Sequence, residues 1–263
     1  MTKPPTPGHP AMPRLHLLGV ARLPEPGTGT DLQLQYRKGW ALLGYLAVER
    51  GRRHPREQLA GMLWPRLDAT AARTNLRQVL SNLQQLFRGL GFPDLIRADK
   101  TTIGVIPEDP SALLFDIDLL DPLLVDEADV VERLLGSGGW QHRGLFLEGV
   151  CVPDSTDFED WLGFTREHFL RREIRLMCAL RDRFRDLGKR MEAIEIGWRI
   201  VRIDAWNESH HRALMLLLSE DGAPHAVQRV YTDLERTLRM HLHCAPSPET
   251  SELYARLLPA LSP

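Results

Sequence analysis

The chain has 263 residues, of which 43% are hydrophobic and 26% are charged, enough for a real core in one large or two ordinary domains. Its three cysteines, Cys151, Cys178 and Cys244, are odd in number and far apart, which excludes a disulfide framework. No apolar run approaches the roughly 20 residues that span a membrane. Pro-rich residues 1–13 lack an apolar signal region and are expected to form a disordered tail. The chain is therefore expected to be cytoplasmic.

The formal net charge of −2 conceals a division along the sequence. Residues 1–107 hold 15 Lys and Arg against 7 Asp and Glu, whereas residues 108–263 hold 18 against 28. A basic first part joined to an acidic second part predicts that only the first part meets a polyanion. Chance clustering is the alternative to that interpretation.

Periodicity and turn residues predict the elements of residues 14–107. Gly51 is placed to end a helix, Pro55 can begin the next one, and Pro65 forbids its easy continuation. Residues 27–31 supply a turn between two short strands. In chain order, we expect strands at residues 15–23 and 32–36, helices at residues 37–50 and from Pro55 toward Pro65, a long helix at residues 68–87, and a β-hairpin at residues 95–106.

The long helix expected at residues 68–87 has two contrasting faces. Asp68 can cap its N-terminus, and one face carries apolar side chains at helical spacing: Ala72, Leu76, Val79, Leu80, Leu83, Leu86 and Phe87. The other face has no carboxylate, and Arg, Asn and Gln are able to bond two atoms of one base edge. We predict DNA contacts from Arg73, Thr74, Asn75, Arg77, Gln78, Ser81 and Asn82. A solvated polar face is the alternative.

Strands, three helices and a hairpin, in this order, form the layout of a winged helix-turn-helix. The second helix of the pair enters the major groove, and the hairpin reaches an adjacent phosphate or the minor groove. We expect contacts at the hairpin tip from Arg97, Lys100 and Thr101. Phosphate contacts are also expected among Arg37, Lys38, Arg52, Arg53 and Arg56, although basic residues at helix ends also complement the helix dipole or solubilise the chain. Trp40 and Trp64 are expected in the core rather than as stacking platforms.

Strand signals fade from about Glu108, and the remainder is predicted to be helical. Ala193-Ile194 and Ala226-Val227 stand 33 residues apart, each in a helix that follows a glycine. A period of about 34 residues is that of tetratricopeptide repeats, which stack and leave a concave groove for a partner. An irregular helical bundle is the alternative. The expected helices are residues 125–135, 157–187, 190–203, 208–219, 223–241 and 248–258.

Arginines are dense along the helix expected at residues 157–187: Arg171, Arg172, Arg175, Arg181, Arg183 and Arg185. Arginine planes suit phosphates and bases, so a small anionic effector such as a nucleotide second messenger is a candidate ligand here, with Arg171, Arg172 and Arg175 as its site. Pairing along the helix with carboxylates such as Glu167 and Asp186 is the alternative.

Other chemical patterns in the sequence are weak. A cluster of His241, His243 and Cys244, with His210 and His211 earlier, has ligand types that suit zinc, but its spacing matches no closed four-ligand site. No Ser/His/Asp or Cys/His nucleophile arrangement and no nucleophile elbow is present. We therefore expect no metal, no cofactor and no enzyme activity.

Several stretches together carry a family resemblance. YRKGWALLGYLAVERGRRHPREQLAGMLWP, ATAARTNLRQVLSNLQQLF and LIRADKTTIGV resemble the DNA-binding half of the streptomycete antibiotic regulatory protein family. FLEGVCVPDSTDFEDWL at residues 146–162 and APSPETSELYARLL at residues 245–258 resemble the bacterial transcriptional activator domain of that family. The resemblance runs from Arg14 to Leu258.

The resemblance implies a transcription activator that binds direct repeats near promoters, usually as side-by-side protomers, and helps to recruit RNA polymerase. Two features depart from the family. The sequence has no Gly-x-x-x-x-Gly-Lys phosphate loop, which argues against nucleotide-switched control. His243 stands where the family tends to place glycine before the Pro-Ser-Pro-Glu-Thr stretch, and a left-handed cap is harder for histidine.

These observations predict a mainly α protein. The expected parts are the tail at residues 1–13, a winged helix-turn-helix DNA-binding domain at residues 14–107, and a tetratricopeptide-like activator domain at residues 108–263. The expected function is sequence-specific activation of transcription, with double-stranded DNA, RNA polymerase and a second protomer as partners and a location at the nucleoid when bound. Two alternatives stay open: a ligand-responsive regulator whose helical domain is the sensor, and a protein-interaction adaptor that does not bind DNA.

Overall fold

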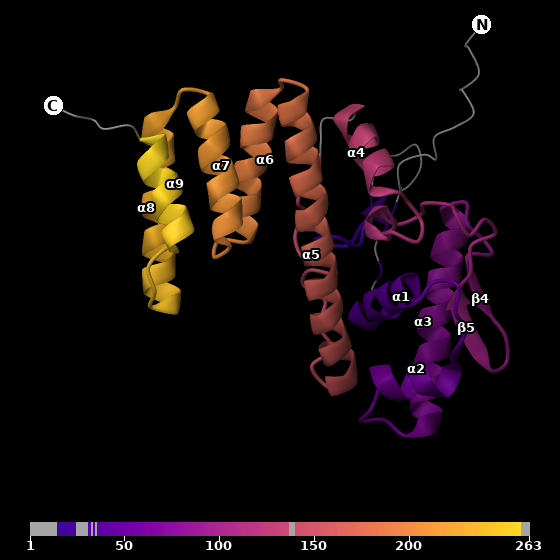
Figure 1. Cartoon of the computed structure of the whole chain (residues 1–263). Coiled ribbons are helices and arrows are strands. Elements are labelled where there is room, and N and C mark those ends of the chain that lie inside the picture. Colours follow the sequence, from indigo (N-terminus) through magenta and orange to yellow (C-terminus); the bar gives the residue numbers. More distant parts are fainter. Residues whose placement is uncertain (1–14, 25–30, 33, 35, 137–139, 259–263) are drawn as a thin grey trace, which may run out of the picture. The chain divides into compact units, whose positions relative to one another are not determined.

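The computed structural model describes residues 15–24, 31, 32, 34, 36–136 and 140–258 (Figure 1). The tail expected at residues 1–13 and most of the turn expected at residues 27–31 lie outside the described residues.

The chain divides into two compact units, each built from two separate stretches of sequence. Unit 1 comprises Met1–Asp126 and His142–Arg171, and unit 2 comprises Glu127–Gln141 and Arg172–Pro263. Unit 1 contains 18 Lys and Arg against 19 Asp and Glu, and unit 2 contains 15 against 16. The charge division along the sequence therefore does not coincide with the division into compact units, and only individual surfaces can carry a net positive charge toward a polyanion. The expected domain limits at residues 14–107 and 108–263 stay a prediction.

Unit 1 contains the predicted winged helix-turn-helix. Its helices are α1 (Arg37–Val48), α2 (Arg56–Leu63) and α3 (Ala69–Gly89), and both α1 and α2 pack against α3. The antiparallel sheet has the order β3-β5-β4, with β3 at His54–Pro55, β4 at Ile96–Ala98 and β5 at Thr102–Val105. The hairpin is as expected, whereas the two-residue strand β3 gives no signal in the sequence. Gly51, at φ +82°, ends the turn after α1, and its N–H donates to the carbonyl of Val105 (2.9 Å).

The first expected strand, at residues 15–23, is wrong as a continuous strand. The segment forms isolated bridges from Leu15 to Phe115, His16 to Arg22 and Leu18 to Phe146, and regular pairing is limited to β1 (Leu23–Pro24) with β2 (Asp31–Leu32). Gly19 interrupts it at φ +73°, where an added Cβ would lie 2.1 Å from the carbonyl oxygen of Arg143. The second expected strand, at residues 32–36, falls partly outside the described residues, and β2 covers only its first residue.

A short 3-10 helix, η1 (Asp116–Leu120), holds that N-terminal segment in place. The Asp116 carboxylate accepts the N–H groups of Leu17 (2.8 Å) and Leu18 (3.2 Å). The Asp118 carboxylate accepts an N–H group of Arg50 (2.8 Å) and the backbone N–H groups of residues 114 and 115. Burial raises the pKa of Asp118 above its ordinary value, although these hydrogen bonds and the Arg50 charge oppose the rise.

The first half of α5 (Thr156–Asp186) completes the core of unit 1. Phe158 and Leu162 are fully buried, and the Trp161 ring lies 4.9 Å from the Tyr45 ring of α1. Arg166 donates to the carbonyls of Phe146 (2.9 Å) and Leu147 (2.8 Å), which fixes the loop that precedes α5.

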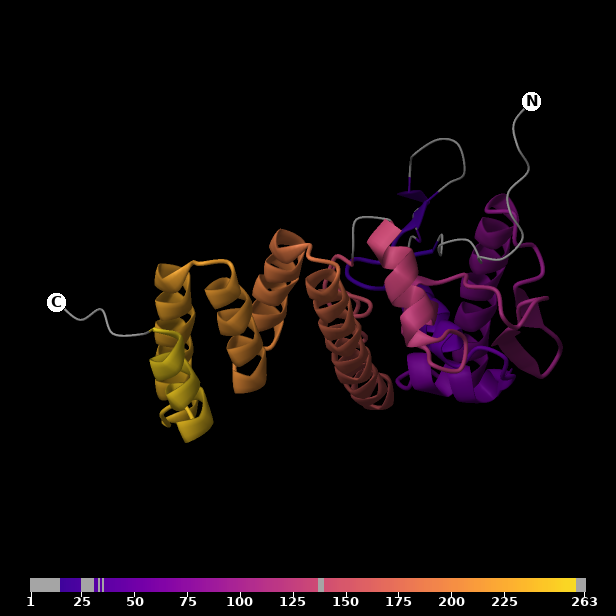
Figure 2. The same ribbon diagram turned by 45° about the horizontal axis from the view of Figure 1, so that its top comes forward.

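Unit 2 is a stack of helices that stand side by side in both views (Figures 1 and 2). It contains α4 (Glu127–Gly136), the second half of α5, α6 (Arg190–Ile203), α7 (Glu208–Glu220), α8 (Pro224–Leu242) and α9 (Pro248–Leu257). Helix α7 packs against α6, α8 and α9. The expected limits agree with these helices to within two residues, and the layout is tetratricopeptide-like.

The repeat is clearest in two identical helix ends. Gly188 and Gly222, 34 residues apart, both take φ +72°. After α5, the N–H groups of Gly188 and Lys189 donate to the carbonyls of Arg185 and Phe184, and after α7 those of Gly222 and Ala223 donate to Ser219 and Leu218. This is the Schellman cap, which a left-handed glycine permits. The turn chemistry therefore repeats with a period of 34 residues.

The end of α8 departs from that pattern because histidine takes the left-handed position. His243 has φ +54° and ψ 30°, and the N–H of Cys244 points back to the carbonyl of Leu238 (3.5 Å). The turn that the sequence left uncertain is therefore formed by histidine in a backbone conformation that favours glycine.

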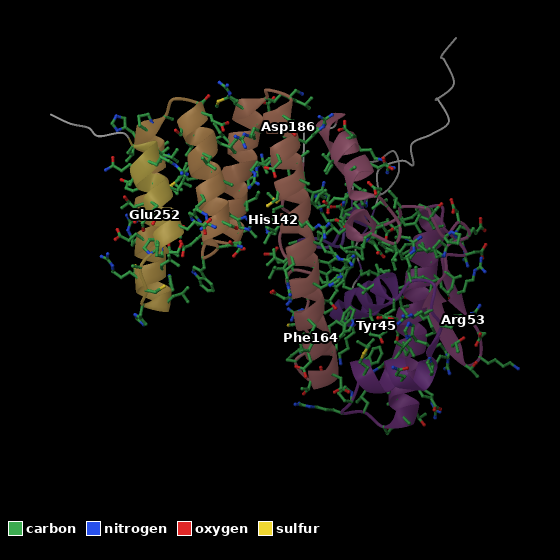
Figure 3. All side chains as sticks on the ribbon, in the orientation of Figure 1. Tyr45, Arg53, His142, Phe164, Asp186 and Glu252 are labelled. Atoms are coloured by element: carbon green, nitrogen blue, oxygen red, sulfur yellow. The ribbon has the colours of Figure 1, made fainter. Side chains whose placement is uncertain are left out.

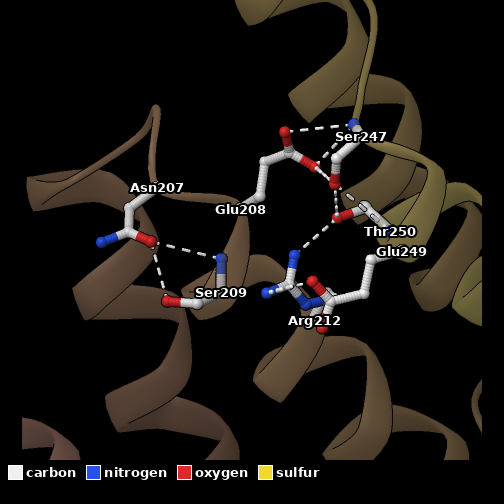
Figure 4. Close-up of polar contacts among 7 residues, drawn as sticks. All are labelled: Asn207, Glu208, Ser209, Arg212, Ser247, Glu249 and Thr250. Carbon is white, nitrogen blue, oxygen red and sulfur yellow. Dashed lines mark hydrogen bonds and ion pairs between the residues drawn. The ribbon is translucent and has the colours of Figure 1, made fainter.

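A polar network joins the start of α7 to the start of α9 (Figure 4). Glu208 accepts the backbone N–H (2.9 Å) and the hydroxyl (2.7 Å) of Ser247, the N-cap of α9. Arg212 donates to the fully buried Thr250 hydroxyl (2.9 Å) and pairs with Glu249 (3.3 Å). Burial would raise the pKa of Glu208, but hydrogen bonds from Thr250 and Ser247 outweigh it, and the pKa is lowered.

We expect His243→Gly to raise the free energy of unfolding by about 1 kcal/mol, because glycine occupies the left-handed region without a Cβ clash. Denaturant unfolding of the full chain measures the change. The matched control is His241→Gly in the last turn of α8, which should lower stability by about 0.5–1 kcal/mol because glycine is a poor helix former. A loss of stability in the first variant would contradict the strain assigned to His243.

We expect Glu208→Gln to lower the free energy of unfolding at pH 7 by about 1–3 kcal/mol, since charged hydrogen bonds to Ser247 are weakened. The folded pKa is lowered, so the carboxylate stabilises the fold above its unfolded pKa and loses that effect as pH falls through the folded pKa. The difference from the native chain should therefore shrink between pH 6 and pH 3. Glu252→Gln, at an exposed position of α9, is the control. A difference that does not depend on pH would rule out this account.

Candidate nucleic-acid interface

Helix α3 is fixed at its N-terminus and along one face. The Asp68 carboxylate accepts the backbone N–H groups of Thr70 and Ala71 at 2.9 Å each, which confirms the predicted N-cap, and these hydrogen bonds lower the pKa of Asp68. The predicted apolar face is buried at Ala72, Leu76, Val79, Leu80, Leu83 and Phe87, and half-buried at Leu86. The opposite face is thereby held toward solvent.

That outward face contains the predicted DNA-contact residues and no carboxylate. Asn75 and Asn82 are half-buried, and Arg73, Thr74, Arg77, Gln78 and Ser81 are exposed. Two of these side chains have local partners: Thr74 donates its hydroxyl to the Thr70 carbonyl (2.9 Å), and Arg73 lies 3.4 Å from Glu57 of α2. Within the described part of the chain, Arg77 has no ion pair.

A surface hollow of about 310 Å³ brings the start of α1 together with α3. It is lined by Tyr36, Arg37, Lys38, Trp64, Asn75, Gln78 and Val79. Helix α1 has no acidic residue in its first turn, and no side chain caps it. A helix N-terminus with two cations favours an anion, while the amides of Asn75 and Gln78 can bond base edges. The hollow therefore unites phosphate-binding and base-reading chemistry that the sequence places 38 residues apart, from Arg37 to Asn75.

Lys38 has a carboxylate partner that the sequence does not reveal. Its Nζ lies 2.8 Å from Asp154 Oδ2 and 5.4 Å from the centre of the Trp64 ring. The hydrogen bond from Lys38 lowers the pKa of Asp154. Trp64 is buried, as expected, and Trp40 is half-buried. Asp154 therefore positions Lys38 and also competes with any phosphate for its charge.

The hairpin tip is organised by Asp99, a residue that is not among the predicted contacts. Its carboxylate accepts the N–H groups of Thr101 and Thr102 (2.8 Å each) and both of their hydroxyls, and these bonds hold its pKa well below the ordinary range. Arg53 donates to the same carboxylate (2.8 Å), and Figure 3 shows Arg53 beside the hairpin. Arg56 donates to the Asp99 carbonyl (2.8 Å).

The predicted basic contacts therefore fall into two groups. Arg53 and Arg56 hold the hairpin tip, and Arg52 pairs with Glu49 (2.9 Å). Among residues that the structure describes, no ion pair involves Arg37, Arg97 or Lys100, which are all exposed. These three cations are therefore available, like Arg77, to an external anion without breaking an ion pair among the described residues.

The arginines of α5 are paired with carboxylates. Arg171 pairs with Glu167 (3.0 Å) in unit 1, whereas Arg175 pairs with Glu127 (2.8 Å) and Arg183 with Glu132 (2.6 Å) in unit 2. Arg181 contacts Asp182, Arg185 contacts Glu220, and Arg172 is half-buried. Pairing along the helix, the alternative to an effector site, holds for Arg171 and Arg181, whereas the carboxylates of Arg175, Arg183 and Arg185 come from α4 and α7. The anionic-effector site at Arg171, Arg172 and Arg175 stays a prediction.

Two kinds of feature are absent from the residues that the structure describes. No group of three His, Cys, Asp or Glu side chains there could hold a metal ion. None of the helices described is long and apolar enough to cross a membrane.

Comparison with known proteins supports both the architecture and the family resemblance. Residues 132–258 match the family model of the bacterial transcriptional activator domain. No curated protein matches the sequence. The fold is similar to that of Mycobacterium tuberculosis EmbR, solved in complex with a low-affinity phosphopeptide, with a TM-score of 0.63 and 18% identity. The match covers 94% of this chain and 65% of the EmbR chain, so the chain spans about two thirds of that relative's length.

We expect Asp154→Asn to strengthen binding to double-stranded DNA by about two- to fivefold at low salt, because it releases Lys38 and removes a neighbouring negative charge. The effect is measured as the dissociation constant for a genomic DNA fragment that the native chain retains. Asp160→Asn makes the same charge change at an exposed position of α5 with no ion pair among the described residues. Equal effects of the two substitutions would mean that only net charge matters.

Proposed function

We propose that this chain, whose residues 132–258 match the bacterial transcriptional activator domain, belongs to the family of transcription regulators that share this domain and is a sequence-specific DNA-binding transcription activator. The observation that carries the DNA-binding part is the outward face of α3, which is rich in Arg, Asn and Gln and has no carboxylate. The family is one of regulators rather than of enzymes.

In the proposed complex, α3 lies in the major groove. Arg77 and Gln78 are exposed on its outer face, where Arg suits guanine and Gln suits adenine in bidentate contacts. Asn75 also lines the hollow beside α1, so it reads a base next to the point where that hollow holds a phosphate. Arg73, Thr74, Ser81 and Asn82 complete the contact face.

Phosphate contacts fix the helix in register. Arg37 and the start of α1 bind one phosphate beside α3, with Lys38 joining once Asp154 releases it. Arg97 and Lys100 contact the backbone from the hairpin, where Asp99 and Arg53 hold the tip in shape. Thr101 supports this turn through its bonds to Asp99 and contacts DNA at the tip.

The helical stack of unit 2 acts as the partner-binding part. In this proposal it mediates self-association on promoter direct repeats and contact with RNA polymerase, and the protein works in the cytoplasm at the nucleoid. Stacked helix pairs present an extended surface that suits such contacts. A protein-interaction adaptor that does not bind DNA is the competing class, and the following experiment separates the two.

We expect Arg77→Ala and Asn75→Ala each to weaken binding to a retained genomic fragment by about 5- to 150-fold, since a bidentate base contact contributes roughly 1–3 kcal/mol of discrimination. Retention of genomic fragments by the native chain supplies the DNA, and titration measures the dissociation constants. Arg88→Ala and Gln85→Ala, at exposed positions near the far end of α3, are the matched controls. Absence of any retained fragment would favour the adaptor, and equal losses in tests and controls would remove the base-reading role.

We expect Lys100→Ala to weaken binding to specific and non-specific DNA alike and to make the plot of log affinity against log salt shallower by about 0.9, the effect of one lost phosphate contact. A salt series on the same fragment measures this slope. Arg53→Ala should instead loosen the hairpin tip, because Arg53 is paired with Asp99. Binding that does not change with salt would exclude the phosphate contacts proposed here.

A further inference from the structure

Unit 2 has a groove between α6 and α8, which each pack against α7. Its volume is about 550 Å³. Helix α6 and the residues after it contribute Trp198, Val201, Arg202 and Ala205, α7 contributes His211, and α8 contributes Arg229, Val230, Asp233 and Thr237. The walls thus combine apolar positions with two guanidinium groups.

Those two arginines differ from several neighbours on the same helices. Arg199 pairs with Glu195, Arg236 with Asp233, and Arg239 with Glu235. By contrast, Arg202 and Arg229 are exposed in the groove, and the described residues give neither of them a carboxylate partner. The one acid that lines the groove, Asp233, lies 3.3 Å from Arg236. The groove therefore presents positive charge that the unit itself does not neutralise.

One aromatic contact lies in the groove, and a second involves Trp206, the residue that follows Ala205 of the lining. The Arg229 guanidinium lies 5.4 Å from the centre of the Trp198 ring, and the rings of Trp206 and His241 lie 6.1 Å apart. Trp206 is 55% exposed, although a large aromatic side chain is usually covered. Burial keeps the pKa of His211 below its ordinary value, so the groove's histidine is neutral at pH 7 and the arginines supply its charge.

The lining suits an extended acidic segment. Arg202 belongs to α6 and Arg229 to α8, so the two guanidinium groups lie on different walls of the groove. A segment that lies between the two helices can place an acidic side chain at each arginine, while Trp198, Val201 and Val230 accept an apolar side chain. The volume of about 550 Å³ exceeds that of a single inorganic anion.

We propose that the groove between α6 and α8 binds an extended segment of a partner protein that carries acidic and apolar side chains. Guanidinium groups bind carboxylates with directed hydrogen bonds, and arginine and tryptophan are the side chains that dominate protein interfaces. This inference rests on the proposed function only in assigning partner binding to unit 2, and it does not depend on whether unit 1 binds DNA.

The test is selection from an array of random nine-residue peptides with the full-length protein. The native chain should select peptides rich in Asp and Glu, and the double charge reversal Arg202→Glu with Arg229→Glu should lose that preference and select Lys and Arg instead. The same charge reversal outside the groove, Arg190→Glu with Arg256→Glu, should keep the preference for Asp and Glu, which excludes an effect of net charge alone. Selection of peptides without acidic enrichment, or no selection by the native chain, would overturn the proposal.

The best acidic peptide then gives a quantitative measurement by fluorescence anisotropy. Arg202→Gln with Arg229→Gln should weaken its binding at least tenfold. The matched control is Arg190→Gln with Arg256→Gln, two exposed arginines of unit 2 outside the groove, which should bind as the native chain does. Equal weakening in both double variants would overturn the assignment.

Two further measurements separate other outcomes. Sedimentation without peptide shows whether the native chain dimerises through this groove; a dimer lost only in the groove variants would mean that a second copy occupies it, against the proposal. DNA retention by the groove variants should stay unchanged. Loss of peptide binding with intact DNA retention assigns the groove to the partner alone, whereas failure of peptide selection leaves the DNA-binding proposal standing.

Discussion

The fold of unit 1 depends on two buried carboxylates, each of which needs hydrogen-bond donors close to it. Asp116 and Asp118 are 5% and 3% exposed, and an ionised carboxylate in such a place is tolerated only with close hydrogen-bond donors. The donors come from the segment at Leu17 and Leu18, from Arg50 after α1, and from the backbone just before η1. This need for donors draws three distant stretches of the chain together beside the helix-turn-helix.

Helices that are determined by residues close together in the sequence could be predicted from the sequence. Helix α6 has the limits that its periodicity predicts, and α3 has the predicted cap and apolar face. The structure of residues 15–23 could not be predicted from the sequence. The backbone N–H of Leu17 donates to Asp116, 99 residues away, and not to a neighbouring strand. Strand β3 and helix η1 could not be predicted for the same reason, because each is short and depends on contacts with residues distant in the sequence.

The candidate interface could also be predicted only in part. Helical periodicity alone establishes which side of α3 faces outward, so Arg77 and Gln78 could be selected from the sequence. Which basic side chains are paired with a carboxylate could not be predicted, because Asp154 is 116 residues from its partner Lys38 and Asp99 is 46 residues from its partner Arg53. Composition had suggested a basic half, but the acids of residues 108–126 and 142–171 belong to the same unit and balance it. An anion that binds the protein is therefore attracted by the charge of the surface that it contacts, and not by the net charge of the unit.

The alternation of the two units along the chain has a consequence for synthesis. Residues 142–171 supply fully buried side chains such as Phe158 and Leu162 to unit 1, yet Arg171 lies 66 residues beyond the end of β5. At about 5–20 residues per second, the ribosome needs roughly 3–13 s to add that stretch. For that interval the nascent winged helix keeps apolar surface uncovered, so chaperones at the ribosome can contact the helix-turn-helix before its own α5 does.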